Sequence, residues 1–353
     1  MKMRKRLSII LALTLAFVMI VSLAGCGDSG STQAPDTESD GAAQSTEPEF
    51  VLKIGHDMPE THPYHNFCLA FKEEVEKNSN GRIQIDIFSN AVLGSEVEMT
   101  EGLRLGTLDF LVSTTANSSS LIPKLGVLGM PFLYQSVDHA VAVTHDPDIL
   151  VYWQDVVKDA DVGITLLNIA ASGWRNIYST FPVTKLEDLK GVNLRCQAAE
   201  IEAKIWTALG CNTVTMPISE VYTSFQTGLI DAAENCATSY VTNAHNEVAP
   251  YFSQTEHTLM IHPILASNQA LEKLDGDLQK VVYDAAATAS DALFDAQQKL
   301  DAENLQKAID GGVTYTENVD MSAAYQTAAE YHKQFAADLG ASDGLDAIMA
   351  KVD

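Results

Sequence analysis

Basic residues are scarce in this chain. Lys and Arg total 22 against 47 Asp and Glu among 353 residues, so the formal net charge at pH 7 is −25. Proteins bind nucleic acids through basic surfaces, and this acidity therefore excludes a nucleic-acid-binding function. It also repels small anions at long range. A site for an organic anion would need a local concentration of positive charge, which makes the few arginines informative.

Cysteines are also few, and their positions do not suggest a disulfide framework. The chain has five of them. Cys196 closes one expected strand and Cys211 opens the next parallel strand, so the two should lie at opposite ends of a sheet, too far apart to bridge. We interpret Cys68, Cys196, Cys211 and Cys236 as small buried side chains; a pair brought together by the fold stays an alternative.

Sequence motifs of enzymes are missing as well. The chain has no Gly-x-Ser-x-Gly elbow and no phosphate-binding loop, and no zinc-ligand spacing beyond one weak case. That case is the loop at residues 55–65, where His56, His62 and His65 accompany two carboxylates. A metal site, helix capping and hydrogen bonding to a polar ligand are alternatives for this loop. We predict a protein that is not an enzyme and binds neither a metal nor a cofactor.

The N-terminus has the features of a targeting segment. Four basic residues among residues 2–6 precede an apolar run from Leu7 to about Val21, which ends in Leu23-Ala24-Gly25-Cys26. The run is shorter than the roughly 20 residues that a membrane-spanning helix needs. We predict a lipoprotein signal peptide at residues 1–25, with Cys26 as the lipidated first residue of the mature protein. Residues 26–49 then form a flexible acidic linker, since they contain almost no large apolar side chain.

Short apolar runs alternate with helix-length segments in residues 191–235. This alternation is typical of βαβ units and a parallel sheet. Arg195 falls at the carboxyl end of one expected strand, and Glu234 and Asn235 fall at the end of another. Ligands of open α/β sheets bind at that edge. A guanidinium facing an amide side chain suits a carboxylate, so the stretch predicts a binder of small organic acids.

Five motifs follow one another in the same stretch. They are Leu194-Arg195, Gly210, Met216-Pro217-Ile218-Ser219-Glu220-Val221-Tyr222, Gln226-Thr227-Gly228-Leu229-Ile230-Asp231 and Glu234-Asn235. In this order they resemble the solute-binding proteins of TRAP (tripartite ATP-independent periplasmic) transporters, the DctP family. The resemblance extends from about residue 50 to the C-terminus.

The resemblance implies an α/β fold: a two-lobed clamp like that of periplasmic binding proteins, with a central cleft and a long helix spanning both lobes. We assign residues 50–172 and 261–300 to lobe I, and residues 173–260 and 301–353 to lobe II. Residues 278–309 are uninterrupted helix formers, which predicts a helix of roughly 45–50 Å, too long for one lobe. Ser95-Glu96-Val97 and Ser219-Glu220-Val221 each precede a helix, a glycine and a strand, an echo expected of two similar lobes.

The resemblance also assigns binding roles in lobe II. Arg195 matches the family arginine that holds the substrate carboxylate in a bidentate salt bridge. Asn235 matches the asparagine that hydrogen-bonds the ligand from the opposite strand end. Arg175, two residues after Gly173, matches an arginine that points into the cleft. An ordinary ion pair for Arg195 and a surface cation–π contact for Arg175 are the structural alternatives.

Further contacts are expected from lobe I. His56 lies in a loop that borders the cleft in the family, and Glu96 and Thr114 lie where relatives contact the polar tail of the ligand. His257 and Tyr240 are additional candidates at the cleft edge, with simple packing as the alternative.

Three departures from the family pattern concern the pocket wall. Cys236 stands where proline is usual, Cys196-Gln197 replaces a β-branched residue and proline, and Ile218 occupies a position where many relatives have phenylalanine. They leave the carboxylate anchor intact but bear on the exact substrate.

The predicted function is that of an extracytoplasmic receptor, lipid-anchored to the cell membrane, that captures an organic acid in a closing cleft. It would deliver the acid to the small and large membrane subunits of a TRAP transporter. The polar residues of lobe I favour a sugar acid such as a hexuronate. A C4-dicarboxylate or sialic acid binder, and a sensor lipoprotein that presents its ligand to a receptor, are the alternatives.

Overall fold

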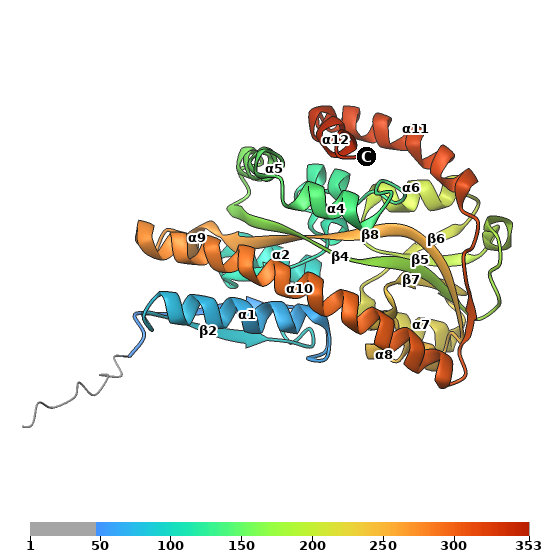
Figure 1. Cartoon of the computed structure of the whole chain (residues 1–353), viewed down its shortest axis with the longest axis horizontal. Helices are drawn as coiled ribbons and strands as arrows, with labels where there is room; N and C mark the ends of the chain where they lie inside the picture. The colour runs from blue at the N-terminus through green and yellow to red at the C-terminus, as the bar shows by residue number, and fades with distance from the viewer. Residues whose placement is uncertain (1–46, 353) are drawn as a thin grey trace, which may run out of the picture. The chain divides into compact units, whose positions relative to one another are not determined.

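A mixed nine-stranded sheet runs through residues 47–352, the part of the chain that this computed structural model describes (Figure 1). Its order is β2-β1-β3-β8-β4-β7-β5-β6, and β9 pairs with β8. The strands are β1 (Phe50–Gly55), β2 (Ile83–Phe88), β3 (Phe110–Val112), β4 (Ile164–Ser179), β5 (Asn193–Cys196), β6 (Asn212–Thr215), β7 (Ala232–Asn235), β8 (Tyr251–Ser267) and β9 (Thr314–Thr316). The predicted signal peptide, Cys26 and most of the linker lie outside the described residues.

Helices cover both faces of this sheet. They are α1 (Pro63–Asn78), α2 (Glu96–Leu105), α3 (Thr115–Ser118), α4 (Val137–Thr144), α5 (Pro147–Asp159), α6 (Glu200–Ala208), α7 (Val221–Thr227), α8 (Ala237–Thr242), α9 (Asn268–Leu271), α10 (Gly276–Asp310), α11 (Ser322–Asp338) and α12 (Ser342–Met349). Four 3₁₀ turns complete the elements: η1 (Pro123–Gly129), η2 (Leu186–Leu189), η3 (Ile218–Glu220) and η4 (His245–Glu247). The predicted α/β class is confirmed.

Two long antiparallel strands join two groups of short parallel strands. β1, β2 and β3 form the first strand group, and β5, β6 and β7 form the second; within each group the strands pair in parallel. β8 and β4 lie between them, 17 and 16 residues long, and pair with each other along most of their length. Their register shifts at three places, one of them between Ala171 and Trp174. Both strand groups therefore depend on the same pair of strands for their relative position.

The long helix α10 packs against β4 and against one helix beside each strand group, α1 and α8. It has 35 residues, about 50 Å of helix, and contacts α1 near its start and α8 near its end (Figure 1). The middle of its buried side consists of small residues, Ala285, Ala286, Ala289 and Ser290, which allow close approach. The predicted long helix is confirmed, two residues longer at its start than expected.

The two echoed Ser-Glu-Val motifs differ in structure. Ser95 caps α2 in a full capping box with Glu98, which stabilises the helix start. Ser219 instead lies in the 3₁₀ turn η3, and α7 begins at Val221 without a side-chain cap. The likeness holds at the other end, where Gly106 and Gly228 end the helices with φ of +72° and +70°.

Apolar side chains fill three clusters around the sheet. Aromatic rings anchor them: Phe67 and Phe71 of α1 in one, Trp153 and Trp206 in a second, Tyr178 and Tyr240 in the third. Burying a side chain of this size stabilises a fold by about 1.5–3 kcal/mol. The four cysteines of the described part are free and buried, as predicted.

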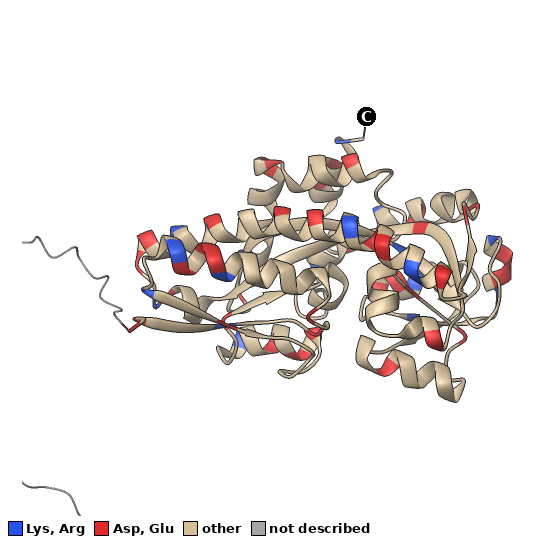
Figure 2. Ribbon diagram, turned by 60° about the horizontal axis from the view of Figure 1, so that its bottom comes forward, with Lys and Arg blue, Asp and Glu red and all other residues tan. Residues whose placement is uncertain are grey.

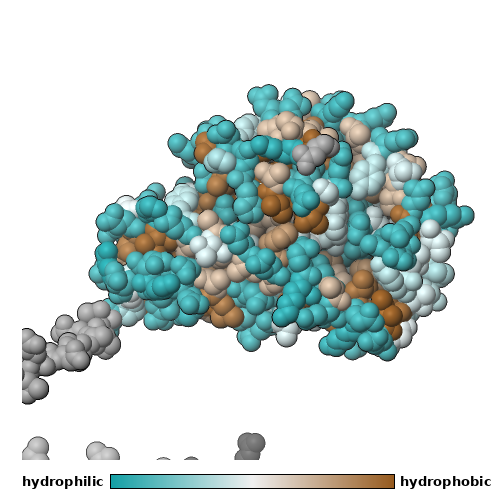
Figure 3. Space-filling view, viewed as in Figure 1, coloured by the Kyte–Doolittle hydropathy of each residue, from teal (hydrophilic) through white to brown (hydrophobic). Residues whose placement is uncertain are grey.

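The surface is polar and acidic. Acidic residues are distributed over the helices in Figure 2, and the whole chain has 47 Asp and Glu against 22 Lys and Arg. The face in Figure 3 is mostly hydrophilic, with small separate apolar groups. Among residues 47–352, no helix combines the length and apolarity needed to cross a membrane.

Gly173 of β4 lies against Gln297 and Asp301 of α10, and we predict that Gly173→Ala destabilises the protein. A Cβ at this position would be 2.2 Å from Oδ2 of Asp301 and 3.1 Å from Cγ of Gln297. Asp301 cannot move freely, because its Oδ1 accepts hydrogen bonds from the backbone N–H and the hydroxyl of Thr238. Overpacking of this kind lowers the free energy of unfolding by about 1–3 kcal/mol.

Urea denaturation of both variants and the wild type checks this prediction. The matched control is Gly276→Ala at the start of the same helix, where a Cβ meets no atom within 4 Å. The control should unfold at the wild-type urea concentration or slightly above it. Equal urea midpoints for Gly173→Ala and the control would show that the contact of Gly173 with α10 does not limit the size of the side chain at this position.

Candidate functional site

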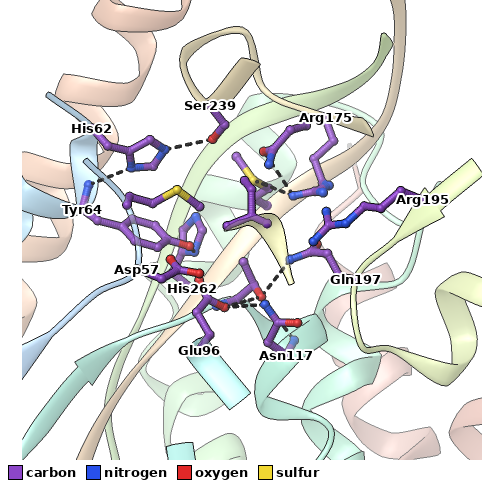
Figure 4. Close-up of a pocket in the computed structure, with 15 residues that line it drawn as sticks. Asp57, His62, Tyr64, Glu96, Asn117, Arg175, Arg195, Gln197, Ser239 and His262 are labelled. Atoms are coloured by element: carbon purple, nitrogen blue, oxygen red, sulfur yellow. Dashed lines mark hydrogen bonds between the residues drawn. The ribbon is translucent and has the colours of Figure 1, made fainter. Parts of the chain in front are cut away.

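A small cavity lies between the two strand groups, at the carboxyl ends of their strands (Figure 4). The space left in it for a water-sized molecule is about 10 Å³, which is roughly what one water molecule needs. Its lining comes from segments far apart in the sequence: Asp57, Met58, His62, Tyr64, Glu96, Thr114, Asn117, Arg175, Arg195, Gln197, Ile218, Asn235, Ser239, Met260 and His262. The structure thus brings together five of the six predicted binding residues.

Arg195, at the end of β5, is a buried guanidinium with a free donor. Its Nε and Nη2 donate to the backbone carbonyl of Met216, at 3.1 Å and 2.8 Å, which fixes the orientation of the side chain. Nη1 has no hydrogen-bond partner within the described residues, although the residue is only 2% exposed. The nearest carboxylate oxygen is Oε1 of Glu234, at 3.9 Å. A buried donor of this kind requires an acceptor, and an anion in the cavity could supply it.

Arg175, on β4, is paired within the protein. Its guanidinium forms a buried ion pair with the carboxylate of Glu234, and its Nη2 also donates to the Glu234 carbonyl at 2.8 Å. Its Nη1 faces Oδ1 of Asn235 at 3.3 Å. Burial raises the pKa of Glu234, but the charge of Arg175 and hydrogen bonds from His257 and Arg175 outweigh it and lower this pKa to about 2. Glu234 therefore neutralises Arg175 and leaves Arg195 as the uncompensated cation.

Sequence reasoning missed the role of Glu234. It noted that Glu234 ends a strand beside Asn235, but local pattern did not reveal the partner on β4. The antiparallel pairing of β4 and β7, with Ile177 opposite Glu234, creates that contact.

Asn235 presents its amide to the cavity. Its Oδ1 accepts from the backbone N–H of Cys236 at 2.9 Å, in addition to Arg175. The oxygen is therefore occupied by the protein, which leaves the amide N–H groups for a ligand acceptor. Arg195 and Asn235 together offer donors from two neighbouring strand ends.

Carboxylates occupy the wall contributed by the first strand group. Oε2 of Glu96 accepts from four donors: the backbone N–H and hydroxyl of Thr114, Nδ2 of Asn117 and the hydroxyl of Ser113, at 2.7–3.1 Å. Oδ1 of Asp57 is buried and has no hydrogen-bond partner in the described part of the chain. Burial and the charge of Glu96 raise the pKa of Asp57 well above its usual range. Asp57 was not predicted as a site residue.

His56 does not line the cavity. Its side chain is buried, with Nε2 3.2 Å from Nδ1 of His65, and burial followed by the influence of His65 lowers its pKa to about 4. His62 and His262 line the cavity instead. His62 belongs to the histidine loop identified in the sequence. It is the N-cap residue of α1, where its Nδ1 accepts a hydrogen bond from the backbone N–H of Tyr64 and its Nε2 faces Ser239.

Three hydrogen bonds cross the cavity between the two strand groups' segments. Nε2 of Gln197 donates to the hydroxyl of Thr114 at 3.0 Å, and Nε2 of His62 lies 2.9 Å from the hydroxyl of Ser239. The backbone N–H of Ala198 donates to Oδ1 of Asn117 at 3.2 Å. These bonds link the segments that follow the strands of the first group to those that follow the strands of the second group.

The two further candidates, His257 and Tyr240, lie behind the cavity wall. Nε2 of His257 is 3.3 Å from Oε2 of Glu234, so this histidine helps to hold the carboxylate that pairs with Arg175. The hydroxyl of Tyr240 donates to the carbonyl of Ala249, and its ring packs in the core. Within residues 47–352, no three His, Cys, Asp or Glu side chains are placed to hold a metal ion together.

Glu202 of α6 should make stability depend on pH. Burial and the charge of Glu234 raise its pKa to about 8, whereas the unfolded chain loses this proton near pH 4.5. Between these values the folded state binds one proton more than the unfolded state, so stability falls as pH rises towards 8. The buried histidines, whose lowered pKa values have the opposite effect, act below pH 6.5.

We predict that Glu202→Gln flattens this decline between pH 6.5 and 8. The wild type should lose about 1–2 kcal/mol more than the variant over this range, since each pH unit corresponds to about 1.4 kcal/mol. Urea unfolding at both pH values measures the difference. Glu200→Gln, which removes an exposed carboxylate from the same helix, is the control and should follow the wild type. Identical slopes for Glu202→Gln and wild type would contradict the assignment.

Known proteins share this sequence pattern and this fold. Residues 54–338 match the family model described as bacterial extracellular solute-binding protein, family 7 (DctP). A solute-binding protein of Sulfitobacter sp. strain NAS-14.1 is 30% identical over 305 residues, which cover 86% of this chain and 92% of that protein.

Solved structures agree with the family match. A TRAP periplasmic solute-binding protein of Xanthobacter autotrophicus Py2 with bound β-D-galacturonate superposes with a TM-score of 0.79 at 29% identity, covering 85% of this chain and 99% of that one. A TRAP periplasmic solute-binding protein of Pseudomonas putida F1 with bound D-glucuronate gives 0.80 at 26% identity, covering 85% and 97%. The two-lobed architecture predicted from the sequence is thereby confirmed. The chain belongs to family 7 of the bacterial extracellular solute-binding proteins, the non-enzymatic receptors of TRAP transporters.

Proposed function

We propose that this receptor binds a sugar acid, with a hexuronate as the best candidate, and delivers it to the membrane subunits of its transporter. The observation that supports this most directly is the unpaired Nη1 of Arg195 in an otherwise closed, polar cavity. The structures with bound galacturonate and glucuronate support the same ligand class.

In this proposal the ligand carboxylate lies at the arginine end of the cavity. Arg195 donates through Nη1 and Asn235 through its amide, while Arg175 stays paired with Glu234 and positions Asn235. Hydroxyls of the ligand meet polar groups at the other end, including Glu96 and Thr114. His56 contributes only from behind this wall. Exclusion of water strengthens the ion pair, because the interaction of two charges grows as the surrounding dielectric constant falls.

Ligand entry requires the two lobes to separate. Sites for small molecules usually enclose about 300–1,000 Å³, far more than the cavity offers in this closed form. We place lobe I at residues 50–172 and 261–300, and lobe II at 173–260 and 301–353, so that β4 and β8 cross the boundary. Opening breaks the three hydrogen bonds described across the cavity. A ligand that contacts both lobes adds its own interactions to the closed form and shifts the population towards it.

We also propose that the receptor is a lipoprotein held at the outer face of the cell membrane through Cys26. The basic and apolar segments before this cysteine and the polar residues after it support the proposal. A linker of this composition would let the receptor reach the small and large membrane subunits while remaining attached.

Removal of the arginine anchor should abolish binding. We predict that Arg195→Ala lowers the affinity for hexuronate by about 2–5 kcal/mol, because a desolvated charge pair is lost. Arg195→Lys should retain part of the affinity, since it keeps the charge without the forked donors. Arg104→Ala, which removes an exposed arginine of α2, is the control and should bind as the wild type does. Isothermal titration calorimetry with glucuronate and galacturonate measures all four proteins.

A thermal-shift panel tests the ligand class itself. A ligand that binds only the folded state raises the melting temperature. Uronates and aldonates should raise the Tm of the wild type, and neutral sugars should not. Stabilisation by neutral sugars alone, or normal hexuronate binding by Arg195→Ala, would overturn the proposed function.

Substitution of Cys26 should release the protein from the membrane. The full-length chain with Cys26→Ser should not incorporate labelled fatty acid in a bacterial host and should appear in the soluble fraction. Cys68→Ser, at a buried position of the folded domain, serves as the control for loss of a thiol and should remain lipidated. Lipid incorporation by the Cys26→Ser protein would contradict the lipoprotein assignment.

A further inference from the structure

The two ends of the cavity differ in charge. Arg175 and Arg195 are the only Lys or Arg residues of the described chain that line it. Arg175 lies on β4 and Arg195 at the end of β5, on the same side of the cavity (Figure 4). Asp57 and Glu96 lie on the opposite wall, and neither has a basic partner there. An anion that spans the cavity would therefore meet donors at one end and carboxylates at the other.

The two carboxyl groups on this wall differ in the number of hydrogen bonds that they accept from the protein. Glu96 is held by four hydrogen bonds, all to Oε2, and its residue is 2% exposed. These donors leave Oε1 free to accept from a ligand. Oδ1 of Asp57 has no hydrogen-bond partner among residues 47–352, although the atom is buried. A buried acceptor without a partner is unfavourable, and ligand hydroxyls are the donors that would satisfy it.

We propose that Asp57 and Glu96 form an acidic wall that makes the receptor select sugar monoacids and reject sugar diacids. The inference rests on the proposed function, since it assumes that Arg195 holds the ligand carboxylate. Hydroxyls at the far end of a uronate or aldonate donate to the acidic wall. An aldarate of the same length brings a second carboxylate there, where it meets the negative charge of Glu96 and no Lys or Arg side chain.

The raised pKa of Asp57 agrees with this arrangement. Burial and Glu96 make a second negative charge on the wall unfavourable even within the protein itself. A third carboxylate, from the ligand, adds to the same repulsion. Water is largely excluded from the cavity, so solvent screens this repulsion poorly.

Calorimetry with matched pairs of ligands tests the proposal. Gluconate and glucarate, and galactonate and galactarate, are pairs of open-chain acids that differ only in the oxidation state of one terminal carbon. The wild type should bind each aldonate at least about a hundredfold more tightly than the corresponding aldarate. Glu96→Gln should reduce this ratio by about tenfold or more, because it removes the like charge. Asp57→Asn should also reduce it, because an amide cannot ionise and offers two N–H donors to the second carboxylate.

Glu60→Gln is the matched control, since it removes an exposed carboxylate from the loop that carries Asp57 without touching the cavity. It should leave the ratio unchanged. Asp57→Asn loses no hydrogen bond of the side chain within the described protein, so it should fold and carry the test even where Glu96→Gln is unstable.

The outcomes separate the two proposals. Equal affinity of the wild type for aldonate and aldarate, or an unchanged ratio in Asp57→Asn, overturns the acidic wall while the receptor for sugar acids stands. Failure of the wild type to bind any of the acids overturns the proposed function, and the acidic wall with it.

Discussion

A buried guanidinium with one unpaired donor is the constraint on which the site depends. Arg195 is held by the carbonyl of Met216 and cannot turn away from the cavity. Removing such a charge from water is unfavourable unless a counter-charge is near. Glu234 lies close, but it is committed to Arg175 and His257, and its distance to Arg195 is too long for a hydrogen bond. Arg195 thus keeps a positive charge without a hydrogen-bonded counter-charge among the described residues, and a bound anion would supply one.

The sheet explains how so many polar groups converge on one place. Parallel strands of each group end at the same edge, and β4 and β8 bring the two edges face to face. Every segment that lines the cavity lies at a strand end, at a helix start or on one of the two long strands. Because β4 also carries Arg175, the strand that links the lobes contributes directly to the site.

Local sequence patterns predicted the parts of this arrangement that local geometry determines. The alternation of apolar runs with helix-length segments placed Arg195 and Asn235 at strand ends, and the run of helix formers predicted α10 almost to its bounds. The exact roles of Glu234 and Asp57 depend on contacts between distant segments, which no local pattern encodes. For His56 and Ser219 the local pattern suggested a role or a likeness that the structure does not show. His56 pairs with His65 outside the cavity while His62, the N-cap of α1, faces it. Ser219 lies in a 3₁₀ turn after Pro217, unlike Ser95, which caps α2.

The contrast between an acidic exterior and a buried arginine has a kinetic consequence. The net charge of −25 acts on an approaching anion over the Debye length, about 8 Å at physiological ionic strength, and slows its arrival. The contact with Arg195 forms inside a closed cavity that mobile ions do not reach. Added salt should therefore accelerate capture of an anion while leaving its residence time nearly unchanged. A receptor of this construction would gather its ligand fastest in saline surroundings, where a basic surface would lose its advantage.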